Sequence, residues 1–422
     1  MEKSEWIESV VSRFRQCCEQ LQEQLGHAAE GSLLDVADEE IFEKFHPLLR
    51  EVQQQAIQKQ IDRKQKHSDY RRCDQCKKKM RHKGTKSFEF ITRAVNIKLS
   101  GTYYHCGCSN SKSVSAFVSS GRRFSHQACE LTSRYAATQS YQQASKYLRK
   151  DFGIWVSHEM LRSRIRDVAG QIKDIRDGNA DEYLWEKLAG QRLYGYVDGV
   201  LINIRKEGWK ECKLLRYQCD PTGQIRPRGL LGPIGRFGRM VRREAIHLGA
   251  KQSSEIVFLM DGAQGLHCHI KKNLPDARQI VDYWHACQHI AECADVLYPK
   301  DEVQLARWRS RYCHILREHG AGRLVNLMRK SKAGLSEEHK VAAVGKLLGF
   351  LQTRVDRMEY QRLLEKGYRI DSGPIESSCK NVVQARLKAC GMRWSRKGAC
   401  AMLEVRCAYM SDIWQDVIQK CA

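Results

Sequence analysis

The sequence predicts a multidomain chain that combines α+β and α/β parts, with a mixed β-sheet core in its second half. Three observations lead to this prediction. The chain has 422 residues, which at roughly 150 residues per domain is enough for about three domains. Strand-like segments and one helical segment alternate between residues 193 and 281, a pattern typical of an α/β sheet. Two close pairs of cysteines flank β-prone sequence in the first third of the chain.

The chain is strongly basic, with 72 Lys and Arg residues against 49 Asp and Glu, a formal net charge of +23. Such an excess favours polyanionic partners, and nucleic acid is the commonest of these. An enzyme acting on other acidic substrates is the second interpretation. The absence of an apolar run near 20 residues argues against a membrane span. The opening MEKSEWIESVVSRFRQ lacks a secretory signal, so a cytoplasmic protein is expected, with its 18 cysteines as thiols or metal ligands.

Residues 1–70 are expected to form an N-terminal helical arm. An amphipathic helix is predicted over residues 5–25. Its apolar positions are Trp6, Val10, Phe14, Cys17, Leu21 and Leu25. A second helical stretch, about 39–66, ends in the polar run QQQAIQKQIDRKQK. Because such a run contributes little to a core, we expect a solvated face or an arm for oligomerisation there.

The cysteine pairs of residues 71–120 have the spacing of a zinc ribbon. Cys73 and Cys76 form CDQC, and Cys106 and Cys108 form CGC after a β-prone stretch. Two turns joined by a strand pair can bring four thiolates around one Zn²⁺ ion. The second pair is one residue shorter than usual, so His105 is a substitute ligand for one cysteine. Chance pairing among 18 cysteines is the alternative.

Residues 121–180 read as three helices, at 126–138, 141–149 and 157–172. Gly153 lies in the turn before the third helix, and Ser157 is placed to cap it. The third helix carries Arg162, Arg164 and Arg166, which suits the recognition helix of a helix-turn-helix element. An ordinary helical hairpin fits the pattern equally well.

Strands are expected at about 193–205, 210–219, 243–248, 255–260 and 278–281, with a helix near 263–272, and the chain after about 284 reads as helical. The segment PRGLLGPIGRFGRM has four glycines, at 229, 232, 235 and 238, with Arg236 and Arg239 among them. Its spacing is not that of a nucleotide-binding loop. We expect a flexible basic loop that can follow a DNA backbone.

Three acidic residues occupy positions in the sequence that suit metal ligands. Asp198 lies inside an apolar strand and Asp261 ends another, each followed by glycine. Two carboxylates at the edge of one sheet can share Mg²⁺ ions with substrate phosphates. Glu376, at the third position of a helix that starts after Gly373, can supply a third carboxylate, although a glutamate there also complements the helix dipole.

In order along the chain, the motifs SYQQASKYL, YVDG, FLMDGA, VDYWH, GPIESSCKNVVQARLK and GMRWSRKGA resemble the ISKra family of bacterial insertion-sequence transposases, of the DDE class. The resemblance covers about residues 70–420. It implies a ribonuclease H-like core formed by residues 190–298 and 366–422, interrupted by a helical insertion at 299–365. It also implies that Asp198, Asp261 and Glu376 are a catalytic triad holding two metal ions, Mg²⁺ or Mn²⁺.

Two of these motifs contain further candidates. Asp282 and His285 of VDYWH lie three residues apart where a strand passes into a helix, so both can face the acids. A helix-start acid and a packing histidine are the alternative. In GMRWSRKGA, the cationic Arg393, Arg396 and Lys397 surround Trp394, an arrangement suited to stacking on a splayed base. Burial of the Trp394 ring explains the motif equally well.

The function expected from the resemblance is that of a DNA transposase, which cleaves DNA and transfers strands of an insertion sequence in a metal-dependent reaction. Its partners would be double-stranded DNA, both transposon ends and target, and further copies of the chain in at least a dimer. The setting would be the bacterial nucleoid. A non-catalytic DNA-binding regulator derived from a transposase and a structure-specific nuclease on the same core are the alternatives.

Overall fold

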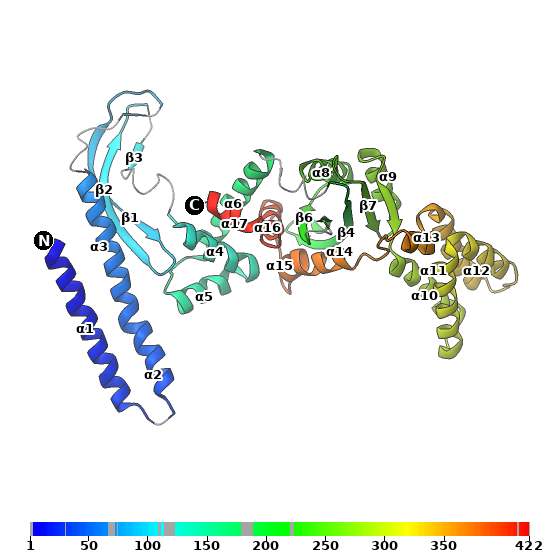
Figure 1. The fold of residues 1–422 in the computed structure, drawn as a ribbon, viewed down its shortest axis with the longest axis horizontal. Helices are drawn as coiled ribbons and strands as arrows, with labels where there is room; N and C mark the ends of the chain where they lie inside the picture. Colours follow the sequence, from blue (N-terminus) through cyan, green and yellow to red (C-terminus); the bar gives the residue numbers. More distant parts are fainter. Residues whose placement is uncertain are drawn as a thin grey trace. The chain divides into compact units, whose positions relative to one another are not determined.

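The computed structural model describes residues 3–29, 31–65, 72–73, 75–108, 111–113, 123–178, 189–219, 223–411 and 413–421. The chain divides into two compact units (Figure 1). The first comprises Met1–Val168 and Asp416–Ala422, and the second comprises Ala169–Gln415. No helix in these ranges is long and apolar enough to cross a membrane.

The first unit begins with the predicted helices. They are α1 (Lys3–His27), α2 (Leu33–Glu40), the π-helical turn η1 (Ile41–Phe45) and α3 (His46–Gln65). The helix α1 folds back on α3, where Trp6 donates a hydrogen bond to Gln55 and Arg13 pairs with Glu51. The rings of Phe14 and Phe45 meet edge to face, with centroids 5.5 Å apart. The amphipathic pattern of residues 5–25 therefore packs within the unit.

The expectation of a solvated polar face on α3 is wrong where this helix meets a small sheet. The side chain of Gln58 bonds both the amide and the carbonyl of Ser100, at 2.8 and 2.9 Å. Gln54 accepts from the amide of Lys98 at 3.0 Å. Glutamines thus satisfy backbone groups that strand pairing leaves open. One turn further on, Ile61 is buried.

That sheet has three antiparallel strands in the order β1-β2-β3. They are β1 (Arg81–Ile91), β2 (Asn96–His105) and β3 (Ser111–Ser113). The register pairs Arg81 with His105, so the segment that enters β1 and the segment that leaves β2 lie at the same end of the hairpin. This is the strand pair that the sequence predicts between the two cysteine pairs.

Three helices follow the small sheet: α4 (His126–Thr138), α5 (Tyr141–Phe152) and α6 (His158–Gly178), whose last part, from Ala169, belongs to the second unit. The start of α6 is capped as predicted, because the Ser157 hydroxyl accepts from the amide of Met160 at 3.1 Å. Gly153 ends α5 with a left-handed φ of 62°, a conformation that favours glycine. A Cβ there would also lie 2.3 Å from a ring carbon of His46. The three predicted helices are confirmed.

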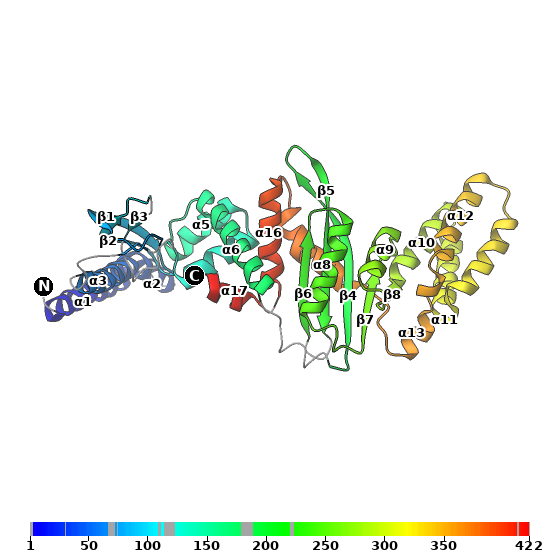
Figure 2. The ribbon, with the colours of Figure 1, turned by 90° about the horizontal axis from the view of Figure 1, so that it is seen from above.

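The second unit is built on a five-stranded mixed sheet in the order β6-β5-β4-β7-β8. Its strands are β4 (Arg192–Ile204), β5 (Gly208–Cys219), β6 (Gln224–Leu230), β7 (Glu255–Met260) and β8 (Arg278–Val281). The first three pair antiparallel, whereas β7 pairs parallel with both β4 and β8. Figure 2 shows the β4–β5 hairpin extending beyond the other strands.

Two predictions fail between β5 and β7. The strand expected at 243–248 belongs mostly to a helix, α8 (Ile234–His247), and the glycine-rich segment is not a loop but the end of β6 and the start of α8. The helix forms because Phe237, Val241 and Ala245 recur at helical spacing and are fully buried. Gly238 allows close packing, since a Cβ there would lie 2.6 Å from the side-chain nitrogen Nδ2 of Asn273.

The rest of this unit is helical, as predicted. After α9 (Gln264–Asn273) come α10 (Tyr283–Leu297), α11 (Glu302–Ala333), α12 (Glu338–Gln352), η2 (Val355–Arg357), α13 (Tyr360–Glu365), α14 (Gly373–Ser378), η3 (Cys379–Gln384), α15 (Ala385–Leu387) and α16 (Arg396–Tyr409). The last helix, α17 (Trp414–Cys421), belongs mostly to the first unit. Helices α8 and α9 pack on one face of the sheet, whereas α14 and η3 contact β4.

Candidate functional site

Four cysteines of the first unit converge as the spacing predicts. The sulfur atoms of Cys73, Cys76, Cys106 and Cys108 all lie within 4.8 Å of one another. Individual S–S distances are 3.5 Å for Cys73–Cys108, 3.2 Å for Cys76–Cys106 and 3.4 Å for Cys106–Cys108. Cys73 and Cys106 are buried. The set can bind Zn²⁺, which prefers four thiolates in its structural sites.

The turn around the first pair favours the ionised ligand. The amide of Cys73 bonds the carbonyl of Lys78 at 2.9 Å, and Lys77 has a positive φ of 57°. The backbone amide of Cys76 is the main cause that lowers the pKa of Cys73 to about 6, from an ordinary value of 9.0. A thiolate is the form that ligates metal. His105, the predicted substitute, is not part of the four-cysteine group.

In the second unit, Asp198 lies within β4 and Asp261 directly follows the neighbouring parallel strand β7. Val197 of β4 is in register with Met260 of β7, so the acids are the next pair along. Because side chains alternate between faces, both project from the same face. The amide of Gly199 donates to Asp198 Oδ1 at 2.6 Å, and the amide of Ala263 donates to Asp261 Oδ1 at 2.8 Å.

Burial is the main cause that raises the pKa of Asp198, and the charge of Asp261 raises it further. The amide of Gly199, the thiol of Cys379 and the nearby His285 lower it. Like charges that face one another are the arrangement a bound cation would relieve. A bound metal ion would therefore relieve the repulsion between these two carboxylates.

The segment with the third acid, Glu376, packs beside β4. Helix α14 begins at Gly373 with Pro374 in its first turn, as predicted, and Glu376 is exposed there. Three residues later, the Cys379 thiol donates to Asp198 Oδ2 at 3.5 Å. Burial is the main cause that raises the pKa of Cys379, and the charges of Asp198 and Glu376 raise it too. Both acids thus lie near one thiol.

Asp282 and His285 have different roles at the start of α10. Asp282 is buried and caps the helix, accepting from the amide of His285 at 2.7 Å and also from the amide of Ser372. His285 Nδ1 lies 3.5 Å from Asp282 Oδ1. That contact is the main cause that raises the pKa of His285, with Asp261 and Asp198 adding to it. His285 faces the two acids, and Asp282 holds it there.

The three acids do not form a closed ligand set. Within the described ranges, the four cysteines are the only group of three or more His, Cys, Asp or Glu side chains whose ligand atoms all lie within 4.8 Å of one another. The sheet and α14 therefore bring Asp198, Asp261 and Glu376 to one region without drawing their oxygens together.

Sequence reasoning misses Arg354, which follows α12. Its Nε donates to the carbonyl of Gly262 at 2.7 Å, and the charge of Asp261 raises its pKa against the dominant lowering by burial. No motif could have found this contact, because 92 residues separate the partners. The predicted helical insertion thus contributes a cation to the turn that carries Asp261.

Not all predicted DNA-binding residues on α6 are available. Arg164 turns inward, donating to the sulfur of Cys129 and lying over the ring of Phe124. Arg162 is exposed but pairs with Glu159 at 2.7 Å, and Arg166 is exposed. The prediction of three arginines on one outer face is therefore wrong for Arg164, whose position on the helix lies beside the buried Leu161 and Ile165.

Trp394 cannot stack on a base in this arrangement. Its ring is buried, and its Nε1 donates to the carbonyl of Leu387 at 3.1 Å. The alternative interpretation, burial of the ring, is therefore correct. The backbone of Trp394 also forms a β-bridge with Ile204 of β4. Around it, Arg393 and Lys397 are exposed, whereas Arg396 pairs with Glu207 at 2.9 Å.

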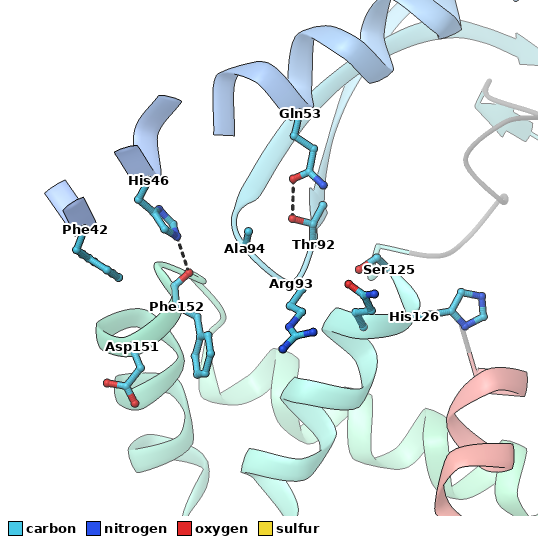
Figure 3. A pocket seen from close by; sticks show the side chains of 11 residues that line it. Phe42, His46, Gln53, Thr92, Arg93, Ala94, Ser125, His126, Asp151 and Phe152 are labelled. Atoms are coloured by element: carbon cyan, nitrogen blue, oxygen red, sulfur yellow. Dashed lines mark hydrogen bonds between the residues drawn. The ribbon is translucent and has the colours of Figure 1, made fainter. Parts of the chain in front are cut away.

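A pocket of about 770 Å³ lies within the first unit (Figure 3). Figure 3 shows the Arg93 side chain extending between Phe152 and the start of α4, with His126 directed away. His46 bonds the carbonyl of Phe152 at 3.0 Å, and its ring stacks on that of Phe42. The lining mixes aromatic, cationic and amide groups, and no sequence motif pointed to it.

A scan against models of protein families gave no match for this chain, and a search of curated proteins gave none either. Function is therefore inferred from the four-cysteine group, from the acids at β4 and β7, and from the motifs that contain them.

Proposed function

We propose that the chain is a DNA transposase of the DDE class, which cleaves DNA strands and joins them to a target. The observation that carries the proposal is the placement of Asp198 on β4 and Asp261 at the end of the neighbouring parallel strand β7, with His285 facing both. Glu376 lies in the first turn of α14, which packs against β4. The order of these residues along the chain is the order in the family that the sequence resembles.

The sheet supports this proposal. Three antiparallel strands are continued by two parallel ones, and the first strand of the unit lies in the middle. A ribonuclease H-like core has a sheet of this kind, with acids on its central strand and on the parallel neighbour. The helices between β8 and α14 occupy the place where the resemblance implies a helical insertion.

The donor set of three carboxylates suits Mg²⁺ or Mn²⁺. Two such ions, held by Asp198, Asp261 and Glu376, would activate a water or 3′ hydroxyl and stabilise the leaving oxygen. The protein's own groups do the rest. His285, whose pKa is raised mainly by its contact with Asp282, can donate a hydrogen bond to a phosphate oxygen when it is protonated. Arg354 fixes the turn after Asp261 through the Gly262 carbonyl.

The first unit would recognise the ends of the element. We assign Zn²⁺ to the four cysteines, which would hold the β1–β2 hairpin, and DNA binding to helices α4 to α6, with Arg162 and Arg166 as contacts. Two ends must be brought together for transposition, so an assembly of at least two chains is part of the proposal. The bacterial cytoplasm, at the nucleoid, is the compartment in which it would act.

One observation favours a second candidate. Since the carboxylate oxygens do not converge among the residues described, a DNA-binding regulator that retains the fold without the chemistry would have the same structure. A nuclease on the same core would cut without joining.

Incubating the purified chain with candidate element ends, target duplex and Mg²⁺, and mapping the strands, separates the three. Joined products support the transposase, cut products alone support the nuclease, and specific binding without cleavage supports the regulator. Asp198→Asn is the matched control, because asparagine can still accept the bond from the amide of Gly199. Products formed at the parent rate by the purified variant would refute the proposed site.

A further inference from the structure

Helices α8 and α9 cover the face of the sheet opposite the acids. Leu193 and Val197 of β4 belong to the core under α8. Asp198 follows Val197 and therefore projects from the other face. Figure 1 shows α8 and α9 on one side of the sheet and α14 on the other. Whatever contacts the outer surface of α8 and α9 is separated from the acids by the sheet.

That outer surface is strongly cationic, and we call it the α8–α9 basic face. Its exposed side chains are Arg236, Arg239, Arg242 and Arg243 of α8 and Lys271 and Lys272 of α9. The one acid on either helix, Glu244, is buried beside Arg228, with 3.3 Å between Nε and Oε1. Arg243 approaches the same carboxylate at 3.7 Å. The other five cations have no acidic partner in the part of the chain that the structure describes.

The two helices that carry these charges pack closely against each other. Gly235 and Gly238 of α8 face α9, where a Cβ on Gly235 would touch the ring of His269 and one on Gly238 would meet Asn273. Two glycines inside a helix cost about 1 kcal/mol each relative to alanine. What they permit is a close approach of the two helices that carry the arginines and lysines.

The face also has a defined direction relative to the acids. Leu214 of β5 pairs with Asp198 on one side and with Gly229 of β6 on the other. Both α8, which follows β6, and α9, which follows Asp261, therefore begin at the edge of the sheet that carries the acids. From Arg236 to Arg243 the cations extend about 10 Å along α8, close to three base-pair steps of a duplex at about 3.4 Å each.

We propose that the α8–α9 basic face binds the phosphate backbone of duplex DNA, without reading sequence, as a second contact separate from the site of cleavage. The proposal rests on the proposed function in taking DNA as the partner. Because the sheet lies between this face and Asp198, the duplex segment on it is not the segment being cut. The face would instead hold flanking or target DNA as it passes the edge of the sheet.

The test compares two sets of three substitutions in the full-length zinc-loaded chain. Arg239→Ala, Arg242→Ala and Lys271→Ala remove charge from the face. Arg307→Ala, Arg323→Ala and Lys330→Ala remove the same charge from exposed positions of α11. Binding to a duplex of random sequence is measured over a range of salt concentrations without Mg²⁺. Each lost phosphate contact should reduce the slope of log K against log salt by about 0.9.

The first set should lower the slope by up to about 2.7 and weaken binding at least tenfold at low salt, while the α11 set leaves the slope unchanged. Arg239→Lys with Arg242→Lys should also leave it nearly unchanged. Equal effects of both alanine sets, or no effect of the first in a variant with a normal melting curve, would overturn the proposal. The binding measurement does not depend on cleavage, which is measured separately with Mg²⁺ and candidate element ends. A chain that binds through this face but gives no cleavage in that assay contradicts only the transposase. A chain that cleaves normally but whose salt slope is unaltered by the first set contradicts only the basic face.

Discussion

The four cysteines and the three acids are two candidate metal sites that the chain builds in opposite ways. The cysteines come from two turns at one end of a single hairpin, and the register of β1 and β2 brings their sulfurs together. The acids come from two strands and a helix, up to 178 residues apart (376 − 198), and their oxygens stay separate. Structural metal sites are closed by protein ligands, whereas catalytic ones stay open for substrate. The difference suggests a site that folds around its ion and another that is completed by substrate.

The largest effect should come from the closed site. Cys73→Ser with Cys76→Ser should abolish zinc binding and unfold the β1–β2 hairpin, since structural zinc in small modules contributes on the order of 10 kcal/mol. Elemental analysis and thermal melting measure both. The parent chain should hold one zinc. Less than about half an equivalent, unaffected by these substitutions, would show that the cysteines bind no structural ion.

Next in size is the loss of a carboxylate from the open site. Glu376→Gln should lower strand cleavage by about 100-fold or more, the scale for removing one preorganised charged group, with DNA binding unchanged. Melting temperature should hardly change, in contrast with the cysteine variants. Cleavage at the parent rate by Glu376→Gln would show that Glu376 is not a catalytic ligand and only complements the helix dipole of α14.

A smaller effect should appear in the pH dependence. Asp282 raises the pKa of His285, so the imidazolium persists to higher pH than usual and is lost as pH rises through the raised value. Asp282→Asn retains a capping oxygen for α10 but removes the charge. The alkaline limb of the cleavage profile, and the titration of His285 by NMR, should both move to lower pH. An unmoved titration would mean that the contact at 3.5 Å does not control the histidine.

The smallest effect concerns the insertion. Arg354→Gln removes the bond to the Gly262 carbonyl, and one such bond contributes about 1 kcal/mol, or roughly fivefold in cleavage rate. Arg362→Ala, an exposed change on α13, is the matched control. If both variants cut equally well, the insertion does not position the turn that carries Asp261.

Local signals in the sequence predicted the elements, and partners distant in sequence explain the failures. Cysteine spacing predicted the four-cysteine group because the hairpin brings neighbours together. The glycines of α8 were misread because their purpose, contact with His269 and Asn273 of α9, cannot be seen in the segment itself. Trp394 was ambiguous for the same reason, since its partner Ile204 lies on a distant strand. The sequence singled out Asp198, Asp261 and Glu376, but it did not predict the distances between their carboxylates in the folded chain.

The bridge between Ile204 and Trp394 has a consequence for the order of synthesis. Ile204 lies at the end of β4, the strand that carries Asp198, and its bridge partner Trp394 is synthesised 190 residues later (394 − 204). At about 5 to 20 residues per second, that interval is about 10 to 40 s. During this time the β4–β5 hairpin can form, with Ile204 paired to Gly208, but the bridge to Trp394 and the helices that follow Glu376 cannot. The nascent chain would therefore carry an assembled four-cysteine module well before Glu376 can join the other two acids.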